Sequence, residues 1–173
     1  MSNSNEIKIV GATTEEHLDH VRNLINAFVT WHLKRHFEDI DLINEYFDPN
    51  DFEKELASLP GKYSMPAGRL LLAFYNDHPA GCVALKQIDG HSCEMKRMFV
   101  CPEFHGKGIG HALAKAIIDE AKKTGYSSMK LDTSIRQIEA QKLYQGFGFR
   151  NTEAYYELPG KLKNWLVFME LKL

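Results

Sequence analysis

Three glycines within five positions constrain this chain of 173 residues most strongly. Gly106, Gly108 and Gly110 lie in the segment FHGKGIGHAL, which follows a strand-like run, EMKRMFV, and precedes an apolar pattern with a helical period. Glycine loses more backbone entropy on folding than any other residue, so a cluster at a helix entrance indicates a tight turn or a close approach to a ligand. We therefore predict a strand, a glycine loop and a helix, in that order.

The helix after this loop offers a site for an anion at its start. Backbone N–H groups in the first turn of a helix have no partner within the helix, and the helix dipole places partial positive charge there. Both effects favour phosphate, so we predict a pyrophosphate group as the ligand of the loop. A turn that only lets the helix pack closely on the strand is the alternative. Positive or protonatable side chains surround the loop at His105, Lys107, His111 and Lys115.

The net charge of the whole chain does not attract phosphate or other anions. Lys and Arg number 21 and Asp and Glu 23, giving a net charge of -2, so we expect neither nucleic acid nor a membrane surface as a partner. The start MSNSNEIKIV lacks the basic and apolar parts of a signal peptide, and no apolar run reaches the roughly 18 residues of a membrane span. We therefore expect a cytoplasmic protein.

The apolar pattern divides the chain into a mainly helical first third and a strand-rich remainder. Helical spacing occurs at 18–28, 31–37, 49–56, 109–123 and 140–147. Runs with strand character occur at 6–10, 69–75, 79–88, 92–101, 127–133, 149–156 and 166–171. The connections NDHP and DGH are short enough for antiparallel hairpins, so the second, third and fourth strands are expected to be neighbours.

A dinucleotide site is a second phosphate-binding reading of the same loop. Asp132 follows Gly110 by 22 residues and ends a predicted strand, close to where a ribose-binding acid would stand. The glycines, however, alternate instead of following G-x-G-x-x-G, and antiparallel hairpins do not belong in a doubly wound parallel sheet. The dinucleotide reading is therefore disfavoured.

FHGKGIGHAL after CEMKRMFVCPE resembles the acyl-CoA pyrophosphate loop of the GNAT acetyltransferase superfamily, and LYQGFGFR (143–150) resembles that superfamily's tyrosine-bearing second motif. The resemblance covers roughly residues 69–173. It implies an α/β three-layer GNAT fold with a mixed, mostly antiparallel sheet, splayed between its fourth and fifth strands. It also implies a single N-acetyltransferase domain over 1–173, with 1–68 as a mainly helical acceptor side and 69–173 as the acetyl-CoA-binding core.

The same resemblance implies the residues that contact the cofactor. The backbone of the fourth strand would pair with the pantetheine arm, and the glycine loop would hold the pyrophosphate. His105 stands where the superfamily has arginine or glutamine, and Gln137 stands where it often has asparagine. The implied cofactor-binding residues are Met98, Phe99, Val100, His105, Gly106, Lys107, Gly108, Ile109, Gly110, His111 and Gln137.

Two side chains are candidates for catalysis. Tyr144 matches the superfamily tyrosine near the cofactor sulfur, where a phenol can donate a hydrogen bond to the developing thiolate. Glu94 stands in a strand expected to be central, where charge is costly unless it is paired or functional. Some superfamily members have a glutamate on this strand near the acetyl carbon, so Glu94 is the candidate base. A salt-bridged pair of Glu94 and Lys96 without chemistry is the alternative.

These observations favour acetyl transfer from acetyl-CoA to a primary amine, by direct attack in a ternary complex and with no metal. The acceptor is expected to be a small-molecule or peptide amine, and the helical segment with Trp31, His32, His36 and Phe37 is expected to border it. The sequence leaves the identity of the acceptor and a homodimeric state open. A noncatalytic acyl-CoA-binding sensor or interaction domain is the alternative function.

Overall fold

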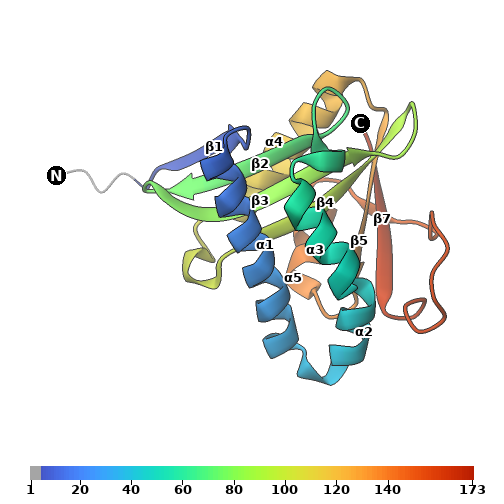
Figure 1. Cartoon of the computed structure of the whole chain (residues 1–173). Helices are drawn as coiled ribbons and strands as arrows, with labels where there is room; N and C mark the ends of the chain where they lie inside the picture. The colour runs from blue at the N-terminus through green and yellow to red at the C-terminus, as the bar shows by residue number, and fades with distance from the viewer. Residues whose placement is uncertain (1–4) are drawn as a thin grey trace.

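A seven-stranded sheet forms the middle layer of the protein, in a computed structural model that describes residues 5–173 (Figure 1). The spatial order of the strands is β1-β2-β3-β4-β5-β7-β6. The strands are β1 (Ile7–Gly11), β2 (Arg69–Tyr75), β3 (His78–Gln87), β4 (Ser92–Val100), β5 (Ser128–Ser134), β6 (Arg150–Asn151) and β7 (Leu166–Lys172). The α-helices are α1 (Glu15–Arg35), α2 (Ile40–Tyr46), α3 (Pro49–Ser58), α4 (Ile109–Thr124) and α5 (Ile138–Gly146).

Helices cover both faces of the sheet. On one face, Val21 and Ile25 of α1 are fully buried and belong to the same apolar cluster as Leu72 of β2. On the other face, Leu113 and Ile117 of α4 are fully buried in a cluster that continues into β3, β5 and α5. This arrangement is the predicted three-layer α/β fold, because each helix buries one apolar stripe against one side of the sheet.

The sheet is mostly antiparallel, as the short connections predict. β2 pairs with β3 and β3 pairs with β4 in antiparallel register. β4 and β5 are parallel, and their pairing ends at Glu94 and Lys130 although β4 continues to Val100 and β5 to Ser134. The two central strands therefore diverge toward their carboxyl ends, and this divergence confirms the splayed sheet.

β4 also contains a bulge beside the point of divergence. The register against β3 shifts between Cys82 and Ala84, where β4 passes Arg97, and Arg97 has a positive φ of 55°. A bulge bends a strand and redirects the side chains that follow it. Arg97 reaches the helical layer, where its Nε lies 2.7 Å from Oε2 of Glu55 in α3.

The strand predicted at 149–156 is wrong for most of its length. β6 contains only Arg150 and Asn151, and Tyr155 and Tyr156 lie in the irregular segment that joins β6 to β7. Both tyrosine rings pack against Phe168 of β7, while their hydroxyl groups reach carboxylates of β4 and β5. These hydroxyl contacts hold the segment over the face of the sheet, so it does not extend the sheet edge.

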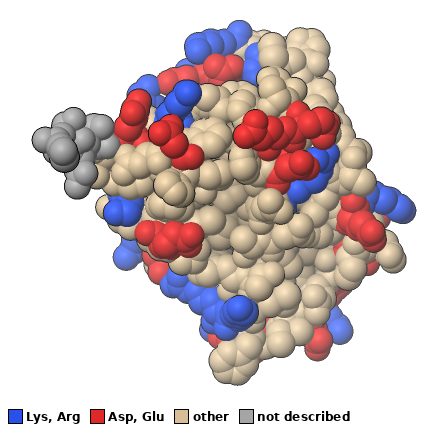
Figure 2. All heavy atoms as spheres, turned by 60° about the vertical axis from the view of Figure 1, so that its left-hand side comes forward, with Lys and Arg blue, Asp and Glu red and all other residues tan. Residues whose placement is uncertain are grey.

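Charged side chains of both signs are interspersed on the face that carries β1 and α1, as Figure 2 shows. No large surface of a single sign gathers on the face in that view, in keeping with the net charge of -2. Within residues 5–173, none of the helices has the length and apolar character needed to cross a membrane.

Candidate active site

A cleft of about 370 Å³ opens at the carboxyl end of β4, which diverges there from β5. Its walls are the end of β4, the glycine loop, the C-terminal half of α1 and the start of α5. Most of the predicted cofactor-binding residues meet in this cleft, namely Met98, Phe99, Val100, His105, Gly106, Gly108, Ile109, Gly110 and Gln137.

The glycine loop has the backbone geometry that its composition predicts. Gly106 and Gly108 have φ values of 76° and 81°, in the left-handed region that side chains rarely adopt. Gly108 is the N-cap of α4, and the first helical hydrogen bond runs from the N–H of Ala112 to the carbonyl of Gly108. The N–H groups of Ile109 and Gly110 lie before the first N–H group that is bonded within the helix, so they are free of helical partners. The first turn of α4 carries no acidic side chain. The start of α4 can therefore accept an anion.

Three predicted phosphate contacts have neighbours of their own. The Nε2 atom of His105 lies 2.8 Å from the last carbonyl oxygen of β4, so its ring turns back toward the strand. The Nζ of Lys107 lies 5.1 Å from the centre of the Tyr75 ring, and the His111 ring is 4.7 Å from that of Phe147. Lys107 and His111 thus contact aromatic rings outside the cleft wall.

The expected acceptor wall on α1 is divided between two spaces. Trp31 and His36 line the cleft beside the glycine loop, so they face the predicted cofactor. His32 lines a deeper cavity, and Phe37 is 71% exposed. An α-helix turns by about 100° per residue, so neighbouring positions on one helix can face different spaces.

The deeper cavity, of about 50 Å³, adjoins the cleft. The two spaces share Phe28, Met98 and Gln137 as lining residues. Tyr144 lines the cavity, and burial, followed by the charge of Asp132, raises the pKa of its hydroxyl well above the usual value. Tyr144 therefore stays protonated at neutral pH and is available as a hydrogen-bond donor.

Gln137 connects the cavity wall to α1. Its Oε1 accepts a hydrogen bond from Thr133 Oγ1 at 2.9 Å, and its Nε2 lies 2.8 Å from Nδ1 of His32. His32 is only 2% exposed, and burial, followed by the charge of His36, lowers its pKa to about 4. The Nε2 of His32 is buried and has no hydrogen-bond partner within the described residues.

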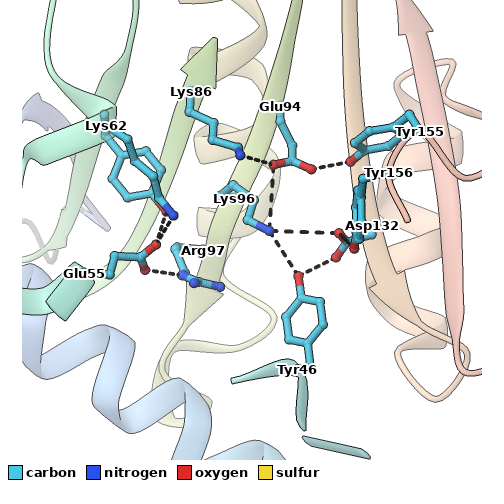
Figure 3. A network of polar contacts seen from close by, with 11 residues as sticks. Tyr46, Glu55, Lys62, Lys86, Glu94, Lys96, Arg97, Asp132, Tyr155 and Tyr156 are labelled. Carbon is cyan, nitrogen blue, oxygen red and sulfur yellow. Dashed lines mark hydrogen bonds and ion pairs between the residues drawn. The ribbon is translucent and has the colours of Figure 1, made fainter. Parts of the chain in front are cut away.

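Glu94 lies at the centre of a polar network on the α1 side of the sheet, which Figure 3 shows. Its side chain is 3% exposed, and Oε2 accepts a hydrogen bond from the hydroxyl of Tyr155 at 2.5 Å. Oε1 lies 3.4 Å from Nζ of Lys86 and 3.8 Å from Nζ of Lys96. The pairing with Lys96 is present, so both readings of Glu94, base and structural ion pair, stay compatible with its position.

A second buried carboxylate belongs to the same network. Asp132 of β5 has a side chain that is 1% exposed, and it accepts hydrogen bonds from Tyr46 at 2.5 Å and Tyr156 at 2.7 Å. Nζ of Lys96 lies 3.9 Å from Oδ2 of Asp132 and 3.2 Å from the Tyr46 hydroxyl. Lys96 therefore stands between the two carboxylates (Figure 3).

A third hollow, of about 500 Å³, opens beside this network. Glu94, Tyr155 and Tyr156 line it, and it shares Tyr46, Lys96 and Arg97 with the deeper cavity. The cleft, the cavity and the hollow thus form a series of three neighbouring spaces, from the glycine loop to the polar network, in which each space shares lining residues with the next. Such a series can bring two substrates together from opposite sides.

Sequence reasoning missed part of this site. Tyr46, Tyr155 and Tyr156 stand in no motif, and their hydroxyl contacts depend on tertiary structure. The sequence pattern presents Asp132 only as a ribose-binding acid. A charged residue inside a predicted buried strand, the signal that singled out Glu94, applies equally to Asp132 and could have found it.

The fold is that of an acyltransferase family. The chain belongs to the acetyltransferase (GNAT) family, whose model matches residues 26–149. An uncharacterized N-acetyltransferase of Schizosaccharomyces pombe is 39% identical over 149 residues, which are 79% of this chain and 90% of that protein.

Two further comparisons extend this result. The N-acetylaspartate synthetase of Danio rerio is 34% identical over 115 residues, covering 64% of this chain and 40% of that protein. The PaiA N-acetyltransferase of Thermoplasma acidophilum, solved in complex with coenzyme A, is 20% identical, with a TM-score of 0.71 over 97% of this chain and 99% of that one. This last likeness shows the fold.

Proposed function

We propose that the protein transfers the acetyl group of acetyl-CoA to a primary amine, by direct attack in a ternary complex. The observation that carries this proposal is the series of neighbouring spaces from the glycine loop, past Tyr144, to the polar network around Lys96. Acetyl-CoA would occupy the cleft, with its pyrophosphate at the start of α4 and its thioester in the deeper cavity. The amine would arrive from the hollow.

The reaction needs a group that removes a proton from the amine. An alkylamine with a pKa near 10.4 is neutral in only about one molecule in 2,500 at pH 7. As the neutral nitrogen attacks the thioester carbon, the bond from carbon to sulfur breaks, and a proton that leaves the nitrogen ends on the departing sulfur, directly or through solvent. Before that attack, the ammonium form has to lose its first proton. Glu94 is the candidate acceptor of this proton, because it is a buried carboxylate that lines the acceptor-side hollow.

The departing thiolate needs a hydrogen-bond donor. Tyr144 lines the cavity where the cleft and the hollow meet, and its raised pKa keeps the hydroxyl protonated. A hydrogen bond from this hydroxyl would stabilise negative charge that develops on the sulfur, and full proton transfer is not required for this effect.

The acceptor is a small-molecule or peptide amine in this proposal, and an amino acid with an acidic side chain is one candidate. The name N-acetylaspartate synthetase, borne by several relatives, suggests such an acceptor. The positive groups of Lys86, Lys96 and Arg97, which line the hollow, could meet its carboxylates.

The test is release of the coenzyme A thiol, measured over a panel of polyamines, amino acids, aminoglycosides and peptide amines. We expect amine-dependent release from the wild type. Tyr144→Phe should lower kcat by about 10- to 100-fold, the value of one hydrogen bond to a charged group, with the dissociation constant of acetyl-CoA within about twofold. Tyr126→Phe is the matched control, because that hydroxyl donates to the carbonyl of Ala67, outside the cavity.

A noncatalytic acyl-CoA sensor is the competing function. It would bind acetyl-CoA without release of thiol in the presence of any amine. Equal turnover of Tyr144→Phe and the wild type would remove the role given to Tyr144 while leaving transfer itself in place.

A further inference from the structure

Two buried polar atoms in residues that line the deeper cavity have no hydrogen-bond partner within residues 5–173. They are Nε2 of His32, on α1, and Oγ of Ser134, at the end of β5. The two residues are only 2% and 3% exposed. A buried polar atom without a partner destabilises a fold, so these two atoms indicate that the cavity receives a polar group that supplies the missing hydrogen bonds.

The hydrogen bonds around His32 decide what kind of group that is. Thr133 Oγ1 donates to Oε1 of Gln137 at 2.9 Å, and Nε2 of Gln137 donates to Nδ1 of His32 at 2.8 Å. Burial, followed by the charge of His36, lowers the pKa of His32 to about 4, so the ring is neutral at pH 7. A neutral imidazole that accepts at Nδ1 carries its proton on Nε2. The Nε2 atom is therefore a donor, and the partner it needs is an acceptor with lone pairs.

The cavity lies where the thioester is expected. It shares Phe28, Met98 and Gln137 with the cleft, and Tyr144 of α5 lines it opposite the contribution of α1. A site for one water molecule needs roughly 10–15 Å³, so a cavity of about 50 Å³ admits a group of a few heavy atoms. An acetyl group that enters from the cleft meets these conditions, and its carbonyl oxygen is an acceptor with two lone pairs.

A neutral donor suits a carbonyl oxygen better than it suits a carboxylate. The cations that line the cavity, Lys96 and Arg97, already have carboxylate partners, so the cavity is not prepared for a further full charge. The oxygen of a thioester is uncharged before the reaction and gains negative charge only while the amine attacks. A donor fixed in a buried site stabilises such a developing charge more strongly than water does.

We propose that Nε2 of His32 donates a hydrogen bond to the carbonyl oxygen of the acetyl thioester, and that Gln137 and Thr133 hold the ring in the donor form. When the amine nitrogen bonds to the carbonyl carbon, one electron pair of the C=O bond moves onto this oxygen, and it returns when the C–S bond breaks. His32 keeps its proton throughout and stabilises the oxygen between these two events. The purpose of this contact rests on the proposed acetyl transfer, but the contact itself is measurable without an amine.

The experiment is infrared difference spectroscopy of bound acetyl-CoA, isotope-labelled at its carbonyl carbon, in the absence of any amine. A carbonyl group that accepts a hydrogen bond absorbs at lower wavenumber than one in a dry site without a donor. His32→Asn keeps an acceptor near the position of Nδ1 but has no atom near the position of Nε2, whereas His32→Gln places a donor near the latter. We expect the carbonyl band to move to higher wavenumber in His32→Asn and to return toward the wild-type position in His32→Gln.

Turnover and binding of coenzyme A separate this role from a structural one. His32→Asn should lower kcat by about 10- to 100-fold, the value of one hydrogen bond to a charged group, and His32→Gln should lower it less. Coenzyme A has no acetyl carbonyl, so its dissociation constant should stay within about twofold in both variants if the fold is intact. His20→Asn, on the same helix, is the control, because His20 is not among the described residues that line the cleft or the cavity.

Nitrogen NMR spectroscopy of the imidazole rings, with the His32 signals assigned by their loss in His32→Asn, locates the proton in the complex with acetyl-CoA. A proton on Nδ1, or a carbonyl band in His32→Asn at the wild-type position, would overturn the assignment and leave Nε2 to a bound water molecule. A band that depends on His32 in a protein that releases no thiol with any amine would support the contact and contradict only the proposed transfer.

Discussion

His32 is a histidine that the fold keeps uncharged. It is 2% exposed, and burial, followed by the positive charge of His36, lowers its pKa to about 4. An unfolded histidine has a pKa of about 6.5, so between the two values the unfolded chain binds a proton that the folded chain does not. Stability contributed by neutral His32 is therefore complete above about pH 6.5 and is lost as the pH falls toward 4.

We predict that this single group makes the fold sensitive to acid. The difference of about 2.5 pH units corresponds to up to about 3 kcal/mol of unfolding free energy between pH 7 and pH 4. Urea unfolding of the wild type and of His32→Gln at both pH values checks this, because the variant should lose less stability on acidification. His91→Gln, in an exposed turn, controls for loss of a histidine as such. Parallel losses in wild type and His32→Gln would contradict the prediction.

At the scale of elements, an ion pair joins the bulge in β4 to α3. Glu55 and Arg97 have side chains that are 8% and 11% exposed, with Nε and Oε2 at 2.7 Å. Burial works to raise the pKa of Glu55, but the charges and hydrogen bonds of Arg97 and Lys62 together outweigh it and lower the pKa to about 2. The rings of Phe47 and Phe52 lie 5.2 and 5.9 Å from the guanidinium carbon, so the cation is enclosed.

Glu55→Gln should therefore leave Arg97 buried without its counter-charge. The expected loss is about 3 to 5 kcal/mol of unfolding free energy, as for other broken buried pairs. Lys62 is the other cation bound to Glu55, and the Lys62 side chain is 47% exposed. Lys62→Ala should therefore cost only about 0 to 1 kcal/mol of unfolding free energy. Denaturant unfolding at pH 7 measures the unfolding free energy of both variants. Similar losses for the two would show that the buried pair with Arg97 contributes no more stability than the exposed pair with Lys62.

The elements that sequence reasoning predicted correctly are those with local causes. The hairpins follow from short connections, the glycine loop from its composition, and the end of α4 from Gly125, which adopts a φ of 99°. The segment 149–156 was misjudged because its alternating aromatic residues resemble a strand, although the hydroxyls of Tyr155 and Tyr156 hold it against Glu94 and Asp132. The cleft beside the glycine loop was therefore predictable from the sequence, whereas the polar network depends on how elements distant in the sequence meet.

At the scale of the whole molecule, binding of a cofactor in the cleft should stabilise the fold as a unit. The cleft joins β4, the glycine loop, α1 and α5, which are separated in sequence, so a ligand there contacts both helical layers. A ligand that binds only the folded state at about 100 times its dissociation constant adds about 2.7 kcal/mol. For a protein of this size the midpoint of thermal unfolding should rise by roughly 5 to 11 °C.

Acetyl-CoA should produce this rise and NAD should not, if the glycine loop holds the pyrophosphate of an acyl-CoA. Gly108→Ala tests the loop directly, because Gly108 caps α4 with a φ of 81°, and a side chain there costs roughly 1 to 2 kcal/mol and disturbs the N–H groups aimed at the ligand. Gly90→Ala, in a turn where a Cβ meets no neighbour, is the control and should keep the full shift. A rise with NAD equal to that with acetyl-CoA would contradict a loop that is specific for acyl-CoA, and a full shift in Gly108→Ala would mean that the ligand is held elsewhere than at the start of α4.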